Sequence, residues 1–293
     1  MKLLIVIDEW GWAFEFFARG WKKYSKHEIE IIKYNGLRPP IVAANDAVFA
    51  MSTVVYQRMC KHANVPADKL VVGIRSQYSH EMPGVGRQYA GFIANSKAAY
   101  DKALAAGAEA SKLHYLQGAI DGNIFTHENV AGNTKVGWAG NPNHEVKRVR
   151  LMKGIAEQYG GVVKRSEWGP PVFVPGKTRD SQVAWLRTLG CYLQTSSHEG
   201  LSQALMEAFA CGVPVVATPA GDTSELVPEE WLIPINSEGD CVSEANRKIS
   251  MLFEDKELAR QVGIENRRKF EDEGWCWSKR VHEYDLILET CVK

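Results

Sequence analysis

Short apolar runs alternate along the chain with longer segments in which apolar residues recur at helical spacing. The runs at 2–7, 69–74, 91–94 and 215–217 predict strands that are buried on both faces, as in parallel sheets. A strand, a helix that ends at Tyr24 and a second strand at 28–34 open the chain as a βαβ unit. The pattern therefore predicts an α/β fold. The remaining predicted helices lie at 54–60, 97–106, 180–189, 203–211, 244–253 and 257–271, and another follows a turn at 140–147 and runs to about Tyr159.

The stretch 196–218 combines a polar turn, a short helix, a glycine stop and an apolar strand. Ser202 is a good N-cap residue, and Gly212 ends the helix shortly before the strand. Glu199 lies in the turn before the helix, and Glu207 lies in its second turn. Both carboxylates can therefore face one pocket.

The backbone N–H groups of Gly200, Leu201 and Ser202 lie where the helix begins. Unpaired N–H donors and the helix dipole favour an anion at this position. A phosphate there, flanked by carboxylates that accept hydrogen bonds from hydroxyls, suits a nucleotide sugar. For either glutamate alone, the alternative is an acidic helix start that only complements the dipole.

The same stretch resembles the large family 4 of retaining glycosyltransferases. Its hallmark is S-x-x-E-G-x-S-x-x-L-x-E-A-x-A-x-G-x-P-V-V-A-T, and every fixed position is matched from Ser196 to Thr218. The resemblance implies the GT-B fold, with two Rossmann-like domains, a cleft between them and a C-terminal helix that crosses back to the first domain. It assigns 1–130, joined by 278–293, to the acceptor-side domain and 131–277 to the domain that binds the nucleotide sugar.

The resemblance also implies roles for single residues, and in two places the chain departs from the family pattern. Glu199 is expected to contact the hydroxyls of the donor sugar, Glu207 the ribose, and Lys147 the diphosphate. A lone Gly11 stands where the family often has paired glycines, and Asn141 replaces the usual arginine. The charge of the diphosphate is then either balanced by Arg148 or Arg150 instead, or balanced less fully. The predicted catalytic residues are Glu199 and His80. The predicted donor-binding residues are Gly11, Asn141, Lys147, Arg148, Ser196, Gly200, Leu201, Ser202 and Glu207.

The composition limits which partners the protein is expected to bind and in which cellular compartment it is expected to lie. The 293 residues are 45% apolar, and 35 basic residues balance 35 acidic ones, so nothing in the net charge attracts nucleic acid. The six cysteines form no C-x-x-C pair and no zinc-type spacing, which predicts reduced thiols and no metal site. The apolar run at the start is too short for a signal peptide or a membrane span. We expect a cytoplasmic protein without an integral membrane segment.

The resemblance to family 4 implies a hexosyl- or pentosyltransferase that retains anomeric configuration, and we expect it to need neither a metal ion nor a cofactor. The donor would be a UDP- or GDP-linked sugar, and the acceptor a hydroxyl of a glycan, a small molecule or a hydroxymethylated DNA base. Two alternatives on the same fold stay open, namely a nucleotide-sugar epimerase and a non-catalytic module that binds nucleotide sugars.

Overall fold

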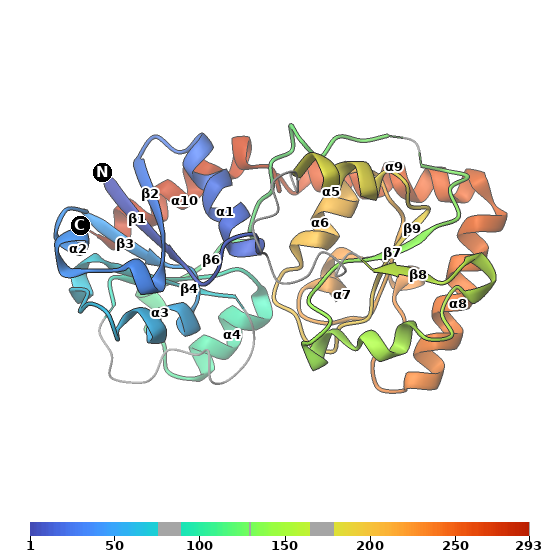
Figure 1. Ribbon diagram of the computed structural model, residues 1–293, viewed down its shortest axis with the longest axis horizontal. Helices are drawn as coiled ribbons and strands as arrows, with labels where there is room; N and C mark the ends of the chain where they lie inside the picture. Colours follow the sequence, from blue (N-terminus) through green and yellow to red (C-terminus); the bar gives the residue numbers. More distant parts are fainter. Residues whose placement is uncertain (76–88, 129, 165–178, 293) are drawn as a thin grey trace. The chain divides into compact units, whose positions relative to one another are not determined.

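The computed structural model describes residues 1–75, 89–128, 130–164 and 179–292, and they form two compact α/β units (Figure 1). Unit 1 comprises residues up to Ala119 together with those from Trp277 onward, and unit 2 runs from Ile120 to Cys276. The division after Ala119 precedes the boundary expected at residue 130, because Ile120 and Phe125 pack into the hydrophobic core of unit 2.

Unit 1 contains a six-stranded parallel sheet in the order β2-β1-β3-β4-β5-β6. Its strands are β1 (Lys2–Ile7), β2 (Glu28–Lys33), β3 (Ala47–Ala50), β4 (Leu70–Ile74), β5 (Gly91–Ala94) and β6 (Leu113–Tyr115). Its helices are α1 (Ala13–Tyr24), α2 (Pro39–Ala43), α3 (Thr53–Met59), α4 (Lys97–Ala105) and α10 (Trp277–Cys291), with short 3-10 turns at Tyr34–Gly36, Ala67–Lys69 and Ala110–Lys112.

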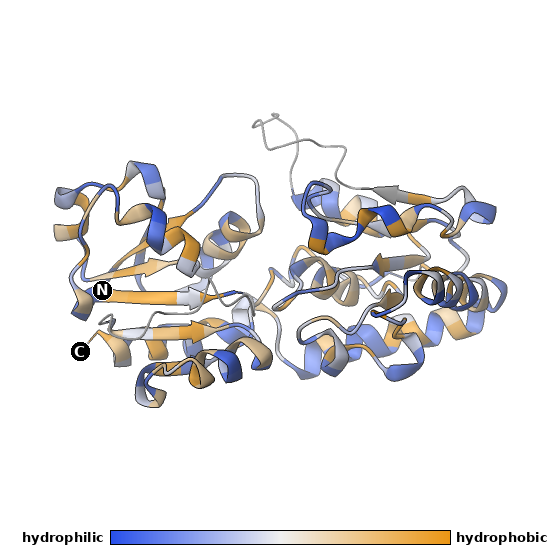
Figure 2. Cartoon of the chain, turned by 90° about the horizontal axis from the view of Figure 1, so that it is seen from below, coloured by the Kyte–Doolittle hydropathy of each residue, from blue (hydrophilic) through white to orange (hydrophobic). Residues whose placement is uncertain are grey.

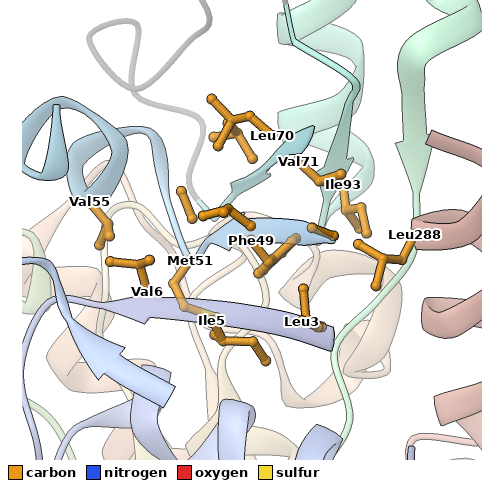
Figure 3. Close-up of a cluster of buried hydrophobic side chains, with 14 of the residues drawn as sticks. Leu3, Ile5, Val6, Phe49, Met51, Val55, Leu70, Val71, Ile93 and Leu288 are labelled. Atoms are coloured by element: carbon orange, nitrogen blue, oxygen red, sulfur yellow. The ribbon is translucent and has the colours of Figure 1, made fainter. Parts of the chain in front are cut away.

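The central strands of unit 1 are apolar along their whole length because helices cover both faces of a parallel sheet. Residues 3–7 of β1 and all of β3 are buried, and Figure 3 shows their side chains meeting those of β4, β5 and α10. The strands are the most hydrophobic segments in Figure 2, whereas the helices carry hydrophilic stretches as well. The predicted βαβ opening is confirmed.

The C-terminal helix α10 packs against α1 within unit 1. A Cβ atom on Gly20 would lie 2.0 Å from Nε1 of Trp277, so only glycine lets the two helices approach this closely. The carboxylate of Asp285, which is buried, accepts hydrogen bonds from Trp21 Nε1 and Ser25 Oγ, both at 2.8 Å. The last helix therefore belongs to the first unit, although unit 2 precedes it in the chain.

Unit 2 contains a four-stranded parallel sheet in the order β10-β9-β7-β8. Its strands are β7 (Val136–Trp138), β8 (Val162–Lys164), β9 (Cys191–Gln194) and β10 (Val215–Ala217). Its helices are α5 (Arg179–Leu186), α6 (Gln203–Ala210), α7 (Thr223–Leu226), α8 (Glu238–Glu254) and α9 (Lys256–Asp272), with a 3-10 turn at Glu229–Trp231.

The prediction of a helix that runs to about Tyr159 is wrong. Three separate 3-10 turns take its place, at Glu145–Lys147, Val149–Met152 and Glu157–Tyr159. Arg148, Gly154 and Ala156 have φ values of 50°, 83° and 57°. This left-handed backbone interrupts the regular hydrogen bonds of an α-helix. The segment therefore forms three short 3-10 turns instead of one helix.

Candidate functional site

The stretch 196–218 has the predicted local structure. Strand β9 ends at Gln194, a turn follows, and α6 begins after Ser202, whose Oγ accepts a hydrogen bond from the Leu205 N–H at 3.4 Å. Strand β10 then returns beside β9. The turn is therefore fixed at the carboxyl end of a central strand, where ligands bind in open parallel sheets.

Glu199 forms an ion pair with Lys147. Lys147 Nζ lies 2.5 Å from Glu199 Oε1, and Ser196 Oγ donates to the same oxygen at 2.7 Å. The side chains of Lys147 and Glu199 are 23% and 12% exposed, so the pair is largely shielded from water. Thr195 Oγ1 also donates to the Lys147 carbonyl at 2.8 Å, which ties the lysine to the turn. Three residues that the sequence singled out, Ser196, Glu199 and Lys147, thus lie in contact.

A second loop packs directly against the Glu199 turn. Gly221 has φ +59°, and a Cβ atom there would lie 2.4 Å from the carbonyl oxygens of both Glu199 and Gly200. The Asp222 N–H donates to the Gly200 carbonyl at 3.1 Å. Only glycine at position 221 permits this approach, so the loop acts as a rigid support for the turn.

The backbone N–H groups at the start of α6 are candidate donors to an anion. Within the part of the chain that the structure describes, those of Gly200, Leu201 and Ser202 donate to no protein acceptor. Orphan N–H groups at the start of a helix favour an anion. The unpaired donors and the Lys147 ammonium thus both supply positive potential near the Glu199 turn.

Glu207 is buried and is held by two residues that the sequence did not single out. Its Oε1 lies 2.5 Å from Arg179 Nη2, and its Oε2 accepts from Gln182 Nε2 at 3.1 Å. The Arg179 guanidinium also lies over the Phe125 ring, 4.6 Å from its centre. Arg179 is the first residue of α5 and Gln182 lies one turn later. No local sequence signal links either residue to a glutamate on α6.

The charges of both glutamates, Glu199 and Glu207, affect the pKa of Tyr192 in β9. Burial raises the pKa of its phenol, and the negative charges of Glu199 and Glu207 raise that pKa further. Its hydroxyl lies 3.5 Å from the Ala139 carbonyl. The charges of both carboxylates therefore act on one side chain of β9.

The other predicted residues of unit 2 are engaged elsewhere. Arg148 is 5% exposed, and its Nη1 donates to the Ile235 carbonyl at 3.0 Å. Arg150 is exposed and pairs with Glu238 at 2.5 Å. Asn141 Oδ1 accepts from the Asn143 N–H at 3.0 Å within its own turn. A contact of any of these side chains with a donor stays a prediction.

Two predicted residues belong to unit 1 by sequence. Gly11, with φ +81°, donates its N–H to the Glu15 carboxylate, and its role towards a donor stays a prediction. His80 lies outside the described residues. The described residues contain no cluster of three histidine, cysteine or acidic side chains able to hold a metal ion. None of the described helices combines the length and the apolar character needed to span a membrane.

Residues 135–255 match the family described as "Glycosyl transferases group 1". An uncharacterized glycosyltransferase of Methanocaldococcus jannaschii, MJ1069, is 31% identical over 126 residues, which are 41% of this chain and 31% of that protein. Protein CapJ of Staphylococcus aureus is 30% identical over 94 residues, 31% of this chain and 24% of CapJ. The chain thus matches less than a third of the length of these relatives.

Solved structures match over nearly the whole chain. Anabaena HepE in complex with UDP and glucose superposes with a TM-score of 0.71 at 15% identity, covering 99% of both chains. Sucrose-phosphate synthase from Thermosynechococcus elongatus superposes with a TM-score of 0.68 at 11% identity, covering 98% of both. The fold is GT-B. The predicted fold class is therefore confirmed, and the family match places a glycosyl transferases group 1 region within unit 2 of this GT-B chain.

Proposed function

We propose that this GT-B chain is a retaining glycosyltransferase that moves a sugar from a nucleotide-diphosphate sugar to an acceptor hydroxyl. The observation that carries the proposal is the Lys147–Glu199 pair beside the unpaired N–H groups of 200–202. The match of residues 135–255 to glycosyl transferases group 1 supports the reaction class. HepE, whose fold this chain shares, has been crystallised with UDP-glucose, which supports a UDP-linked donor.

The ion pair suggests how the site exchanges partners when the donor binds. A diphosphate placed on the N–H groups of 200–202 would offer Lys147 a stronger anion than a single carboxylate. Glu199 would then be released to accept hydrogen bonds from the hydroxyls of the sugar. The pairing of Lys147 with Glu199 leaves neither of these largely buried charges without a partner.

Glu207 is suited to hold the ribose of the nucleotide. A carboxylate offers four lone-pair positions, and Arg179 and Gln182 each use one. The two remaining positions can accept the 2′- and 3′-hydroxyls. The spacing of eight positions between Glu199 and Glu207 then separates the contact with the transferred sugar from the contact with the nucleotide.

Transfer with retention requires no nucleophile from the protein. The bond from the anomeric carbon to the diphosphate oxygen breaks, a bond to the acceptor oxygen forms on the same face, and the acceptor proton passes to the departing diphosphate. The amides of 200–202 and Lys147 would stabilise the charge that develops on the leaving group. Such preorganised electrostatic stabilisation is usually the largest protein contribution to a reaction of this kind, and it needs no metal ion.

Product analysis tests the proposal. The protein is incubated with UDP- and GDP-linked sugars and a panel of glycan, small-molecule and hydroxymethylated-DNA acceptors, and proton NMR follows the anomeric signals. We expect free nucleoside diphosphate together with a glycoside that keeps the anomeric configuration of the donor. An epimerised nucleotide sugar, or saturable binding without any product, would instead identify an epimerase or a binding module.

A further inference from the structure

The two side chains that donate to the Glu207 carboxylate come from one face of α5. Arg179 and Gln182 are three positions apart, so they lie on the same side of the helix. Arg179 Nη2 donates to Oε1 at 2.5 Å, and Gln182 Nε2 donates to Oε2 at 3.1 Å. Each oxygen of the carboxylate therefore has one partner, and both partners belong to a single helix.

These two contacts set the plane of the carboxylate. The last torsion angle of a glutamate side chain has no sharp rotamers, so the partners of the carboxylate decide how it is turned. The side chain of Glu207 is 4% exposed, which leaves little water to compete with these partners. One donor at each oxygen, both fixed to the same helix, therefore favours a single orientation of the Glu207 carboxylate.

The arginine that orients Oε1 is itself held in place. Its guanidinium lies 4.6 Å from the centre of the ring of Phe125, a fully buried residue in the core of unit 2. An aromatic ring packs well against a planar guanidinium, which restricts the orientation of the arginine. The position of Arg179 thus depends on the core of the unit as well as on Glu207.

Each oxygen of Glu207 keeps an acceptor position. A carboxylate accepts at about four positions, and in the described part of unit 2 only Arg179 and Gln182 donate to this side chain. An open position on each of two oxygens that lie side by side suits a pair of neighbouring hydroxyls. A ribose carries such a pair at its 2′ and 3′ carbons, whereas a 2′-deoxyribose does not.

A similar group of side chains on α9 is exposed instead of buried. Arg260 Nη2 and Gln261 Nε2 both donate to Glu257 Oε1, at 2.6 Å and 3.0 Å. The side chains of Arg260 and Glu257 are 44% and 58% exposed, so water competes for these contacts. Substitutions at Arg260 and Gln261 are therefore matched controls for substitutions at Arg179 and Gln182.

We propose that Arg179 and Gln182 are positioning residues that make this chain specific for ribonucleotides. They turn the Glu207 carboxylate so that it accepts hydrogen bonds from both hydroxyls of the ribose. The inference rests on the proposed role of Glu207, and it goes further by assigning the choice between ribose and 2′-deoxyribose to two residues of α5. A site that is built to bond a hydroxyl discriminates against the analogue that lacks it.

Isothermal titration of UDP and GDP, each compared with its 2′-deoxy analogue, tests this discrimination in the whole protein. We expect the wild type to bind the ribonucleotide about tenfold or more tightly than the deoxy analogue, the scale of one hydrogen bond to a charged group. Arg179→Met and Gln182→Met should reduce the preference to about threefold or less, whereas Arg260→Met and Gln261→Met should keep it. A wild-type preference in either α5 variant would overturn the proposal.

Gln182→Met protects the test against loss of folding, because it leaves the ion pair between Arg179 and Glu207 in place. If Arg179→Met does not fold, Gln182→Met alone decides. The same substitution in a Glu207→Gln background separates positioning from a merely structural role. A residue that acts through Glu207 should weaken the nucleotide in the wild-type background and change little in the Glu207→Gln background. Equal losses in the two backgrounds would contradict the proposal.

The wild type distinguishes failure of this inference from failure of the proposed function. If it binds neither UDP nor GDP, the nucleotide-sugar donor is refuted, and the role of α5 is refuted with it. If it binds one of them and the matching 2′-deoxy analogue equally well, the proposed function stands and only the ribose specificity is overturned.

Discussion

Replacing Arg179 with methionine removes the cation from a buried carboxylate. The side chain of Glu207 is 4% exposed and that of Arg179 is 21% exposed. Methionine keeps an unbranched apolar chain against Phe125, so the change acts mainly on the charge. The carboxylate is left with the single hydrogen bond from Gln182.

The expected cost follows from this burial. Breaking a buried pair by removing one partner destabilises a protein by about 3–5 kcal/mol. Because Arg179 is not fully buried and Gln182 still donates, we expect about 3 kcal/mol. The double variant Arg179→Met/Glu207→Gln leaves no unpaired charge, so its loss should fall to about 1 kcal/mol, the scale of one hydrogen bond. Adding Glu207→Gln to Arg179→Met should therefore recover about 2 kcal/mol of the lost stability.

Hydrogen exchange of the β9 and α6 amides at increasing denaturant measures the opening free energy of unit 2 separately from that of unit 1. Arg150→Met is the matched control. Arg150 and Glu238 also lie 2.5 Å apart in unit 2, but their side chains are 61% and 51% exposed. Breaking this ion pair should therefore leave the hydrogen-exchange rates of the β9 and α6 amides unchanged. If the single and double variants lose equal stability, the charge of Glu207 does not depend on Arg179 and the reasoning fails.

Three further predictions concern the same site. Glu199→Gln should lower kcat/KM for transfer by about 10- to 100-fold while UDP binds almost normally in a calorimetric titration; a matching loss of UDP affinity would assign Glu199 to the phosphates. Glu207→Gln should weaken uridine and UDP by the same factor, because the ribose is common to both, and unchanged uridine binding would remove the residue from that role. Gly221→Ala should lower the melting temperature and weaken UDP binding, since it forces a side chain into left-handed backbone against two carbonyl oxygens, whereas Gly239→Ala, with open space around it, should change neither.

The sequence predicted those parts of the fold that local patterns encode. Continuous apolar runs locate the parallel strands, and Ser202 with Gly212 marks the two ends of α6. The helix expected to reach Tyr159 failed for a local reason as well. Two of its interruptions lie at Arg148 and Ala156, residue types that rarely adopt left-handed backbone, so the sequence gave no warning of these two. The third lies at Gly154, a residue type that adopts this backbone readily.

The candidate site was predictable only where its residues share one motif. Glu199 and Glu207 lie within a single stretch, and Lys147 was reached through its position relative to the family pattern. Arg179 was missed because it meets Glu207 only once α5 and α6 have packed together in the folded unit.

The central claim is that the turn before α6 and Lys147 hold the diphosphate of the donor. Isothermal titration of UDP and uridine, and of GDP and guanosine, into the wild type and Lys147→Met measures it most directly. A charge-assisted hydrogen bond to phosphate contributes about 1.5–3 kcal/mol, or roughly 10- to 150-fold in affinity. We predict that Lys147→Met weakens the nucleoside diphosphate by that factor and leaves the nucleoside unchanged. Equal losses for nucleotide and nucleoside, or no loss for either, would contradict the account.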